Sequence, residues 1–344
     1  MTRTELTREL FGRAGGTDVH RYTLSRPGGL TVRVLDYGGV IQSVEAPDRS
    51  GRRADVVLGY PDLDGYVANN RPGAPRVFLG AVIGRFANRI AGGAFTLDGV
   101  LHRVPVNDGK NSLHGGPEGF DTRVWSATPV RDGVRLKLVS PDGDQGYPGR
   151  LTAEVTYRLD SRLHITYRAT TDAPTVVNLT NHTYWNLAGG GTVHDHTLSI
   201  AGSSYCPTDE DLIPAGDPAP VEGTPFDFRV PTPIGARVSA PDPQLAIGGG
   251  YDHNWVLDEG APFAARAWEP TSGRLLTMWT TEPGLQFYSG NYLGSPGAGF
   301  ALEAQHFPDS PNRPDFPSTV LRPGEVYHQE TVFELTTAEE LPTV

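Results

Sequence analysis

Short runs of alternating apolar and polar residues, separated by glycine and proline, constrain this chain more than any other feature. The segment "LTVRVLDYG" places Val32 and Val34 on one face of an extended stretch, and "VRLKLVS" repeats the pattern over 134–138. The 42 glycines and 30 prolines are spread along the whole chain, where they interrupt elements and disfavour long helices. The sequence therefore predicts many short strands.

Later segments repeat the pattern and indicate antiparallel pairing. "LTAEVTYRL" and "LHITYRAT" predict a hairpin, with Asp160 and Ser161 near its turn. "RLLTMWTTEPGLQFYSGNYL" predicts two strands on either side of Pro283 and Gly284, and "EVYHQETVFEL" predicts one more. Because little helix separates successive strands, the predicted fold class is all-β: a large antiparallel β-sandwich.

No internal repeat, low-complexity linker or block of charge divides the 344 residues, so we expect one domain spanning 1–344. All-β sandwiches often reach such lengths. The segments 201–230 and 307–323 are rich in proline, aspartate and glycine and predict long ordered loops, which often carry function. The ends, about 1–5 and 336–344, are expected to fray.

Charge and cysteine content exclude several classes of partner. The formal net charge of −11 repels phosphate backbones, so no nucleic-acid partner is expected. The single cysteine, Cys206, allows no disulfide within the chain and no cysteine-rich zinc site. No secretory h-region and no apolar run of about 18 residues occurs, which favours the cytoplasm and argues against a membrane partner. Motifs do not encode the oligomeric state, and we expect a monomer or a weak homodimer.

Polar and aromatic side chains gather in motifs that a core alone would not need. "VVNLTNHTYWNL" holds His182 among amides and aromatic rings, of which Trp185 suits core packing. "GRFANRIAGGAF" holds Asn88 and Arg89 between glycines, and "NSLHGG" places His114 before a glycine pair. A structural arginine clamp and a satisfied surface histidine are the ordinary alternatives for the last two motifs.

Three further motifs supply carboxylates and an amide. "GGGYDHNW" contains Asp252, "GLQFYSGNYL" contains Gln286, and "FALEAQHF" places Glu303 in an apolar strand. A carboxylate there should be paired or tuned for proton transfer. Carboxylates, amides and arginine suit hydroxyl recognition, and aromatic faces suit the C–H faces of sugars. With no P-loop, strand-linked GxGxxG or GxSxG elbow, the sequence favours a carbohydrate pocket over a nucleotide site.

A metal site at "HDH", residues 194–196, is a weaker hypothesis. On a strand, both imidazoles would lie on one face. HEXXH is absent, however, and no third ligand follows at a suitable spacing. We therefore expect no metal, and we expect His196 to be a hydrogen-bonding group at the end of a strand.

Taken in order, these motifs resemble the aldose 1-epimerase (galactose mutarotase) family, from about Gly28 to Leu335. The matching segments are "GAVIGRFANRIAGGAFTLDG", "NSLHGG", "NLTNHTYWNL", "GYDHNW", "EPGLQFYSGNYL" and "PDFPSTVLRPGEVYHQETVFEL". The resemblance implies an antiparallel β-sandwich with an open sugar-binding cleft on one sheet. It also implies interconversion of the α and β anomers of free aldohexoses such as galactose and glucose, with no metal and no organic cofactor.

The resemblance further implies a role for each matching side chain. Glu303 matches the general base, His182 the general acid, and His114 a second pocket histidine that assists. The remaining matches are polar contacts to the sugar, namely Asn88, Arg89, Asp252 and Gln286.

Three other functions stay open. A hexose-6-phosphate 1-epimerase would need a cluster of basic residues for the phosphate; the sequence shows no such cluster, although Arg123 and Arg313 keep this function open. A glycoside hydrolase would use Asp252 and Glu303 as paired carboxylates. A non-catalytic sugar-binding sandwich would need no acid–base pair.

Anomer interconversion needs a base for the C1 hydroxyl proton and an acid for the ring oxygen. Unperturbed glutamate and histidine nearly have the required ionisation near neutral pH. If no bulge intervenes, alternation places His182 on the same side as Thr180 and Tyr184, with Asn181 and Thr183 pointing away.

Overall fold

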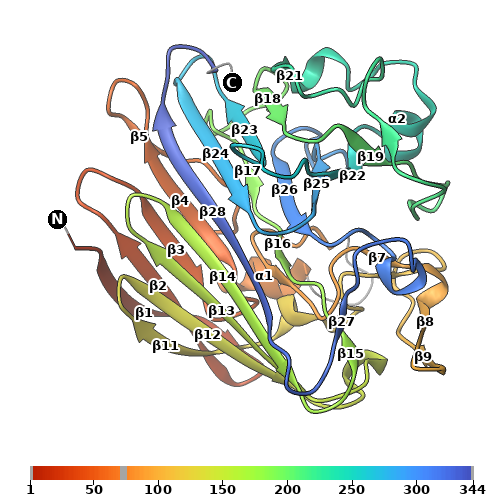
Figure 1. The fold of residues 1–344 in the computed structure, drawn as a ribbon. Helices are drawn as coiled ribbons and strands as arrows, with labels where there is room; N and C mark the ends of the chain where they lie inside the picture. Colours follow the sequence, from red (N-terminus) through yellow and green to blue (C-terminus); the bar gives the residue numbers. More distant parts are fainter. Residues whose placement is uncertain (1–2, 70–75, 342–344) are drawn as a thin grey trace.

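Strands of the computed structural model, which describes residues 3–69 and 76–341, form three large sheets (Figure 1). Within these residues the first sheet has five strands in chain order: β1 (Glu5–Ala14), β2 (Thr17–Ser25), β3 (Thr31–Leu35), β4 (Ile41–Pro47) and β5 (Arg53–Asp55). The second has nine, in the order β11 (Ser126–Val130), β12 (Gly133–Ser140), β13 (Leu151–Leu159), β14 (Leu163–Thr171), β28 (Tyr327–Thr337), β24 (Arg274–Thr280), β23 (Ala265–Trp268), β18 (Thr197–Ile200) and β21 (Thr232–Pro233). The third has six, in the order β17 (Tyr184–Trp185), β26 (Phe300–Gln305), β25 (Gly284–Tyr288), β22 (Asp252–Val256), β19 (Ser204–Cys206) and β20 (Ala219–Pro220).

Smaller elements complete the described part of the chain. Four two-stranded ribbons pair β6 (Val82–Ile83) with β16 (Thr180–Asn181), β7 (Arg89–Ile90) with β10 (Ser112–Leu113), β8 (Ala94–Leu97) with β9 (Val100–Arg103), and β15 (Thr175–Val176) with β27 (Val320–Leu321). The helices are α1 (Leu63–Asn69) and α2 (Pro243–Gly248), with 3-10 turns at Ala91–Gly93, Phe120–Thr122, Asp144–Gly146, Ile234–Ala236 and Ser310–Asn312. Among the residues described, no helix has the length and apolar character needed to cross a bilayer.

The first and third sheets meet edge to edge and form one layer of a sandwich. Val57, just after β5, forms a β-bridge with Trp185 in β17, and the backbone N–H of Asn186 donates to the carbonyl of Val56 at 2.8 Å. Apolar side chains of both sheets share one core cluster with those of the nine-stranded sheet. That sheet is therefore the opposite layer of a two-layered sandwich (Figure 1).

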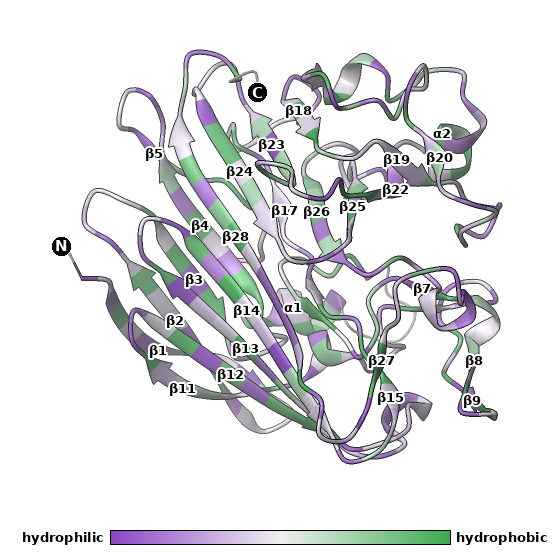
Figure 2. Ribbon diagram, in the orientation of Figure 1, coloured by the Kyte–Doolittle hydropathy of each residue, from purple (hydrophilic) through white to green (hydrophobic). Residues whose placement is uncertain are grey.

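Alternation along the strands of the nine-stranded sheet separates the core from the outer face. In β13 the buried side chains are Leu151, Ala153, Val155, Tyr157 and Leu159. The residues between them are partly or fully exposed, and Figure 2 shows hydrophobic and hydrophilic bands alternating along this part of the sheet. Leu159 pairs with Leu163, which confirms the predicted hairpin.

The predicted all-β fold class is confirmed, and every named strand pair in the described residues is antiparallel. The two strands predicted around Pro283 also exist, as β24 and β25, but they belong to opposite layers. The expected fraying does not extend to Glu5 or to Thr336, because both pair within strands. Residues 1–2 and 342–344 lie outside the described part of the chain.

Candidate active site

Three neighbouring strands of the third sheet bring polar side chains together on one face. The antiparallel register sets Asn254 of β22 opposite Gln286 of β25, and Gln286 opposite Glu303 of β26. Residues on either side of these three point to the opposite, apolar face because side chains alternate along a strand. All six residues of β26 are buried, so its polar face is covered as well as its core face.

Asp252 lies on the same face, two residues before Asn254. The side-chain amide of Gln286 donates to Asp252 Oδ1 at 2.8 Å. Burial raises the pKa of the Asp252 carboxyl, and the positive charge of Arg89 opposes that rise. Arg89, in β7, donates from Nε to Asp108 Oδ2 at 2.8 Å. Its positive charge opposes the rise that burial causes in the pKa of both Asp252 and Glu303, so a cation lies near these two carboxylates.

His182 faces Glu303 across the site. Nε2 of His182 lies 3.6 Å from Glu303 Oε1, and both side chains are almost completely buried. The backbone of His182 is fixed on both sides, because its N–H donates to Ala81 O and its carbonyl accepts from the N–H of Gly80, each at 2.9 Å. Nδ1 of His182 and Oε2 of Glu303 have no hydrogen-bond partner among the described residues. Buried polar atoms of this kind are rare and leave capacity for a ligand.

His114 is held next to this pair in one tautomer. Pairing of β7 with β10 brings His114 to Asn88, whose backbone N–H donates to His114 Nδ1 at 3.1 Å. Nδ1 therefore carries no proton, and in the neutral ring the hydrogen is on Nε2. The following Gly115 is required, because a Cβ there would lie 2.0 Å from the carbonyl oxygen of Gly84. His114 is thus built as a hydrogen-bond donor through Nε2.

Burial shifts the ionisation of the three central groups toward their uncharged forms. It raises the pKa of Glu303 well above its ordinary value; the charge of Asp252 adds to the rise and Arg89 opposes it. It lowers the pKa of His182 to about 4. The pKa of His114 is also well below its usual range because of burial and the nearby charges of His182 and Arg89. The pKa values of Glu303 and His182 therefore differ from those of unperturbed side chains, as expected of a carboxylate in an apolar strand that is tuned for proton transfer.

Comparisons with known proteins agree with this geometry. Residues 20–334 match the family profile described as aldose 1-epimerase. The chain belongs to the aldose 1-epimerase family. It is 44% identical to galactose mutarotase of Rattus norvegicus, over 97% of this chain and 99% of that protein. It is 41% identical to aldose 1-epimerase of Escherichia coli K12, over 91% and 94%. The crystal structure of galactose 1-epimerase from Lactobacillus acidophilus NCFM superposes with a TM-score of 0.87 at 30% identity, covering 97% of this chain and 99% of that one.

Family membership confirms the resemblance found in the motifs. The protein is an isomerase that interconverts the anomers of an aldose, and its substrate is a sugar. Of the site residues expected for this aldose 1-epimerase, the structure brings His114, His182 and Glu303 together, with ligand atoms within 4.8 Å of one another. Arg89, Asp252 and Gln286 adjoin them through the hydrogen bond and charges described above, and Asn88 adjoins them through His114.

The three ligand atoms have the composition of a zinc site, but their hydrogen bonding does not suit a metal. Two imidazoles and a carboxylate are common zinc ligands. A ligating histidine normally donates its other ring N–H to an acceptor, whereas Nδ1 of His114 accepts the N–H of Asn88. Nε2 of His114 therefore keeps its hydrogen and has no lone pair for a metal. The donor set fits sugar hydroxyls better than an ion.

The "HDH" segment is not a strand, contrary to the premise of the metal hypothesis. His194 and Asp195 lie in a turn that precedes β18. Nε2 of His196 accepts the backbone N–H of Leu187 at 2.9 Å, which agrees with the hydrogen-bonding role expected for it.

Side-chain alternation from Asn181 to Tyr184 follows the prediction although the strand is interrupted. β16 ends at Asn181 and β17 begins at Tyr184. The hydroxyl of Thr183 donates to Asn181 Oδ1, and the rings of His182 and Tyr184 have centroids 4.8 Å apart. The two pairs thus separate as expected. Trp185 is fully buried in the main core, which confirms core packing.

Phe287 is also a core residue. It is fully buried and packs among the rings of Phe228, Tyr251 and Trp255. It follows Gln286 in β25, so the strand directs its side chain to the opposite face.

Sequence reasoning missed Phe78 and Arg76. Phe78 contacts the rings of both His114 and His182, and the guanidinium of Arg76 lies over the ring of Phe78. Neither residue belongs to a polar motif, because one is an ordinary aromatic residue and the other lies in an irregular segment. No signal in the sequence points to them.

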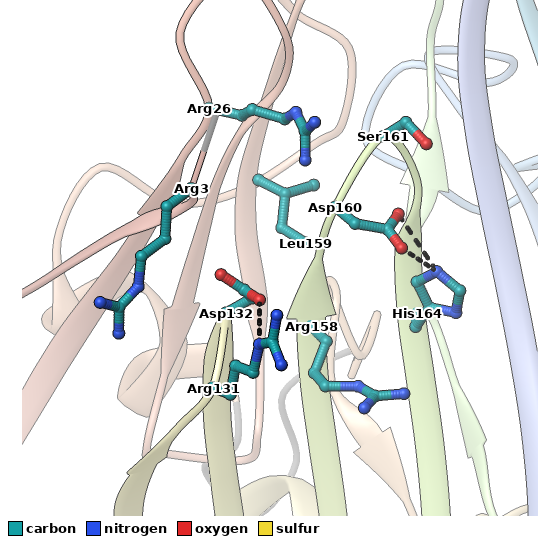
Figure 3. A pocket seen from close by; sticks show the side chains of 9 residues that line it. All are labelled: Arg3, Arg26, Arg131, Asp132, Arg158, Leu159, Asp160, Ser161 and His164. Atoms are coloured by element: carbon teal, nitrogen blue, oxygen red, sulfur yellow. Dashed lines mark hydrogen bonds and ion pairs between the residues drawn. The ribbon is translucent and has the colours of Figure 1, made fainter. Parts of the chain in front are cut away.

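A hollow of about 770 Å³ lies elsewhere, beside the turn between β13 and β14, and is lined by several arginines (Figure 3). Its charged groups pair at the surface: Asp160 with His164, and Arg131 with Asp132, each at 3.3 Å. These ion pairs are largely solvated and worth little. We therefore place the candidate active site at the buried pair of His182 and Glu303 and not at this hollow.

Proposed function

We propose that Glu303 and His182 perform the two proton transfers of sugar ring opening and closure, Glu303 as general base and His182 as general acid. The single observation that carries this proposal is their separation of 3.6 Å within a buried site. Each group has an atom without a partner among the described residues. A base and an acid at this spacing can serve the C1 hydroxyl and the ring oxygen, which are bonded to the same carbon.

The proton balance needs no other reactant. Glu303 takes the proton of the C1 hydroxyl while His182 gives its proton to the ring oxygen, and the bond between C1 and the ring oxygen breaks. Rotation about the C1–C2 bond presents the other face of the open aldehyde. Ring closure then reverses both transfers, and each group recovers its starting form.

Burial of the pair favours the open-chain stage of this sequence. Ring opening starts from the charged form of the pair, a carboxylate and an imidazolium, and leaves a carboxylic acid and a neutral imidazole. The directions of the pKa shifts of both groups favour the second, uncharged state. Loss of two buried charges on ring opening therefore offsets part of the energy of the open aldehyde.

The remaining polar groups are proposed to bind the sugar. His114 donates through Nε2 to a sugar oxygen, since its Nδ1 is occupied by the N–H of Asn88. Asp252 accepts from ring hydroxyls, with Gln286 hydrogen-bonded beside it. Arg89 donates from the guanidinium nitrogens that its Nε contact with Asp108 leaves available.

Free aldoses are favoured over hexose 6-phosphates. Arg313 forms a two-point contact with Asp315, at 3.0 and 2.7 Å. Arg123 donates to Asp144 at 2.7 Å. The two candidate arginines are therefore already paired with carboxylates, which favours an uncharged sugar such as galactose or glucose over a sugar phosphate.

A hydrolase and a sugar-binding module are supported less well. The ionisable group that faces Glu303 at 3.6 Å is an imidazole, whereas a glycosidase needs a second carboxylate across the scissile bond. A binding module would not need a buried acid–base pair. We further propose one domain, a monomer or weak homodimer, and a cytoplasmic location for this epimerase.

Polarimetry on freshly dissolved α-D-galactose and α-D-glucose tests the proposal. The protein should accelerate the approach to the equilibrium rotation, and His182→Asn should lower kcat by at least about 10²-fold with little change in KM. His164→Asn is the matched control, because His164 pairs with carboxylates at the surface. Retention of kcat within about threefold in His182→Asn would contradict the role of His182. Release of reducing sugar from a glycoside would instead support a hydrolase.

A further inference from the structure

Phe78 lies against both histidines of the site. Its ring centroid is 4.7 Å from that of His114 at an interplanar angle of 71°. It is 5.8 Å from that of His182 at 26°. The two imidazoles are 5.4 Å apart and nearly perpendicular, at 85°. One aromatic ring therefore contacts both imidazoles and limits the angle between them.

The backbone holds Phe78 in a conformation that aromatic residues seldom adopt. Its φ of 55° is in the left-handed region. The turn that follows closes with the N–H of Ala81 donating to Phe78 O at 3.0 Å, and the N–H of Gly80 donates to His182 O at 2.9 Å. The turn that orients Phe78 is thus bonded to the backbone of His182. Left-handed residues of this kind tend to occur at functional sites.

The guanidinium of Arg76 lies over the Phe78 ring, with its carbon 4.7 Å from the ring centroid. One terminal nitrogen donates to the carbonyls of Gly116 and Pro117 at 3.0 and 2.9 Å, and the other forms an ion pair with buried Asp121. Gly116 and Pro117 belong to the loop that follows His114. Arg76 therefore links Phe78 to the loop that carries one of the two histidines.

We propose that Phe78 is a positioning residue that holds the imidazoles of His114 and His182 in the relative orientation that the reaction requires, with Arg76 as its clamp. The inference rests on the proposed roles of the two histidines. An imidazole without a fixed neighbour can rotate about its side-chain torsions. A misplacement of about 1 Å can lower the rate about 10²-fold, so a ring that limits rotation contributes to kcat.

Another phenylalanine of the same molecule, Phe95, serves as a control for a purely structural role of Phe78. Phe95 in β8 is buried and stacks on His102, with centroids 5.3 Å apart and an interplanar angle of 28°. His102 lies outside the candidate site. Phe95→Leu therefore removes the same kind of ring–imidazole contact without touching the site histidines.

The test compares kinetics of Phe78→Leu and Phe95→Leu in the full chain, with the melting temperature measured for both. Phe78→Leu should lower kcat by about 10- to 10²-fold while KM changes by less than about threefold. Phe95→Leu should leave kcat within about threefold of the unchanged protein. Phe78→Tyr, which keeps the flat ring, should restore most of the lost kcat.

An unchanged kcat in Phe78→Leu would overturn the inference, and so would a rise in KM alone, because Phe78 would then be a sugar contact. If Phe78→Leu does not fold, Arg76→Lys replaces it, with Arg123→Lys as the control. Arg76→Lys should lower kcat at least about threefold, since lysine lacks the planar guanidinium group. If Arg76→Lys and Arg123→Lys have the same kcat, the proposed role of Arg76 in holding Phe78 is wrong. If His182→Asn keeps full activity, the proposed function fails instead.

Discussion

Strands β13 and β26 belong to opposite layers of the sandwich and differ on their second face. In β13 alternate residues are buried, and those between them are partly or fully exposed. In β26 all six residues are buried, and Glu303 is only 2% exposed. A polar side chain on the exposed face of β13 stays hydrated. A polar side chain on β26 is desolvated and therefore needs a hydrogen-bond partner or a ligand.

Two glutamates make this difference concrete. Glu154 of β13 has a side chain 23% exposed and lies 3.9 Å from the ammonium of Lys137. Glu303 of β26 has a buried oxygen without a partner among the described residues, and burial raises its pKa. The same residue type on two strands is therefore a surface group in one place and a candidate base in the other. Burial of the polar face of β26, and not the strand conformation, is what raises the pKa of Glu303 and makes it a candidate base.

The largest expected effect is the loss of the base. Glu303→Gln keeps the shape of the side chain but cannot accept the C1 hydroxyl proton, so kcat should fall by about 10²- to 10⁴-fold in polarimetry, with a modest change in KM. Glu154→Gln is the matched change on the exposed face and should leave kcat unaltered. Equal activity of the two variants would remove the distinction between the two faces.

Loss of a sugar contact should affect KM more than kcat. Asp252→Ala removes an acceptor for ring hydroxyls, and an unpaired hydroxyl should raise KM by about tenfold or more. Asp160→Ala removes a carboxylate at the arginine-lined hollow and should change neither constant. Initial rates over a range of galactose concentrations distinguish these results. A rise in KM for Asp160→Ala would direct attention to the hollow.

Burial of the pair also predicts the pH profile of kcat/KM. The active pair carries one proton, and adding a second requires protonation of His182, whose pKa is lowered to about 4. Activity should therefore persist as pH falls through 6.5, the ordinary histidine value, and decline only near 4. Loss of the single proton gives an alkaline limb, which lies above the ordinary carboxyl range because burial raises the pKa of Glu303.

Polarimetric rates between pH 4 and 9, corrected for the rate without protein, check this profile. Far-UV circular dichroism at each pH is the control for unfolding. An acid limb centred near pH 6.5 in folded protein would show that an ordinary, solvated histidine controls the reaction.

The sequence allowed the strands and the parity of their side chains to be predicted because both follow from local alternation. The position of Glu303 within an apolar strand already marks it as unusual in the sequence. The burial of the Glu303 side chain could not be predicted, since the residues around it, such as His182, come from segments far away in the chain. The separation of β24 and β25 into opposite layers was hidden for the same reason.

Contacts across the fold account for what sequence reasoning missed at the site. The tautomer of His114 depends on the backbone N–H of Asn88, which the pairing of β7 with β10 brings close. Phe78 contacts the two histidines, and Arg76 contacts Phe78, across the fold, and no sequence motif contains either residue. The pKa shifts of Glu303 and His182 follow from burial, which a motif does not report.

The smallest expected effect concerns two tryptophans in the apolar core, which differ in whether the indole N–H has a hydrogen-bond partner. Trp185 and Trp255 are both fully buried. The indole N–H of Trp255 donates to the carbonyl of Phe226 at 3.1 Å. That of Trp185 has no partner among the described residues. Replacement by phenylalanine removes similar volume from both but breaks a hydrogen bond only at Trp255.

Trp185→Phe should therefore reduce the free energy of unfolding less than Trp255→Phe, by about 1 kcal/mol. At Trp185 the lost packing is partly offset because a buried donor without a partner is also removed. Urea denaturation of both variants measures the difference, and kcat should be unchanged in Trp185→Phe because its ring packs on Phe333 across the core. A loss of kcat there, with stability preserved, would mean that Trp185 contacts the sugar and that the polar face extends further than β26.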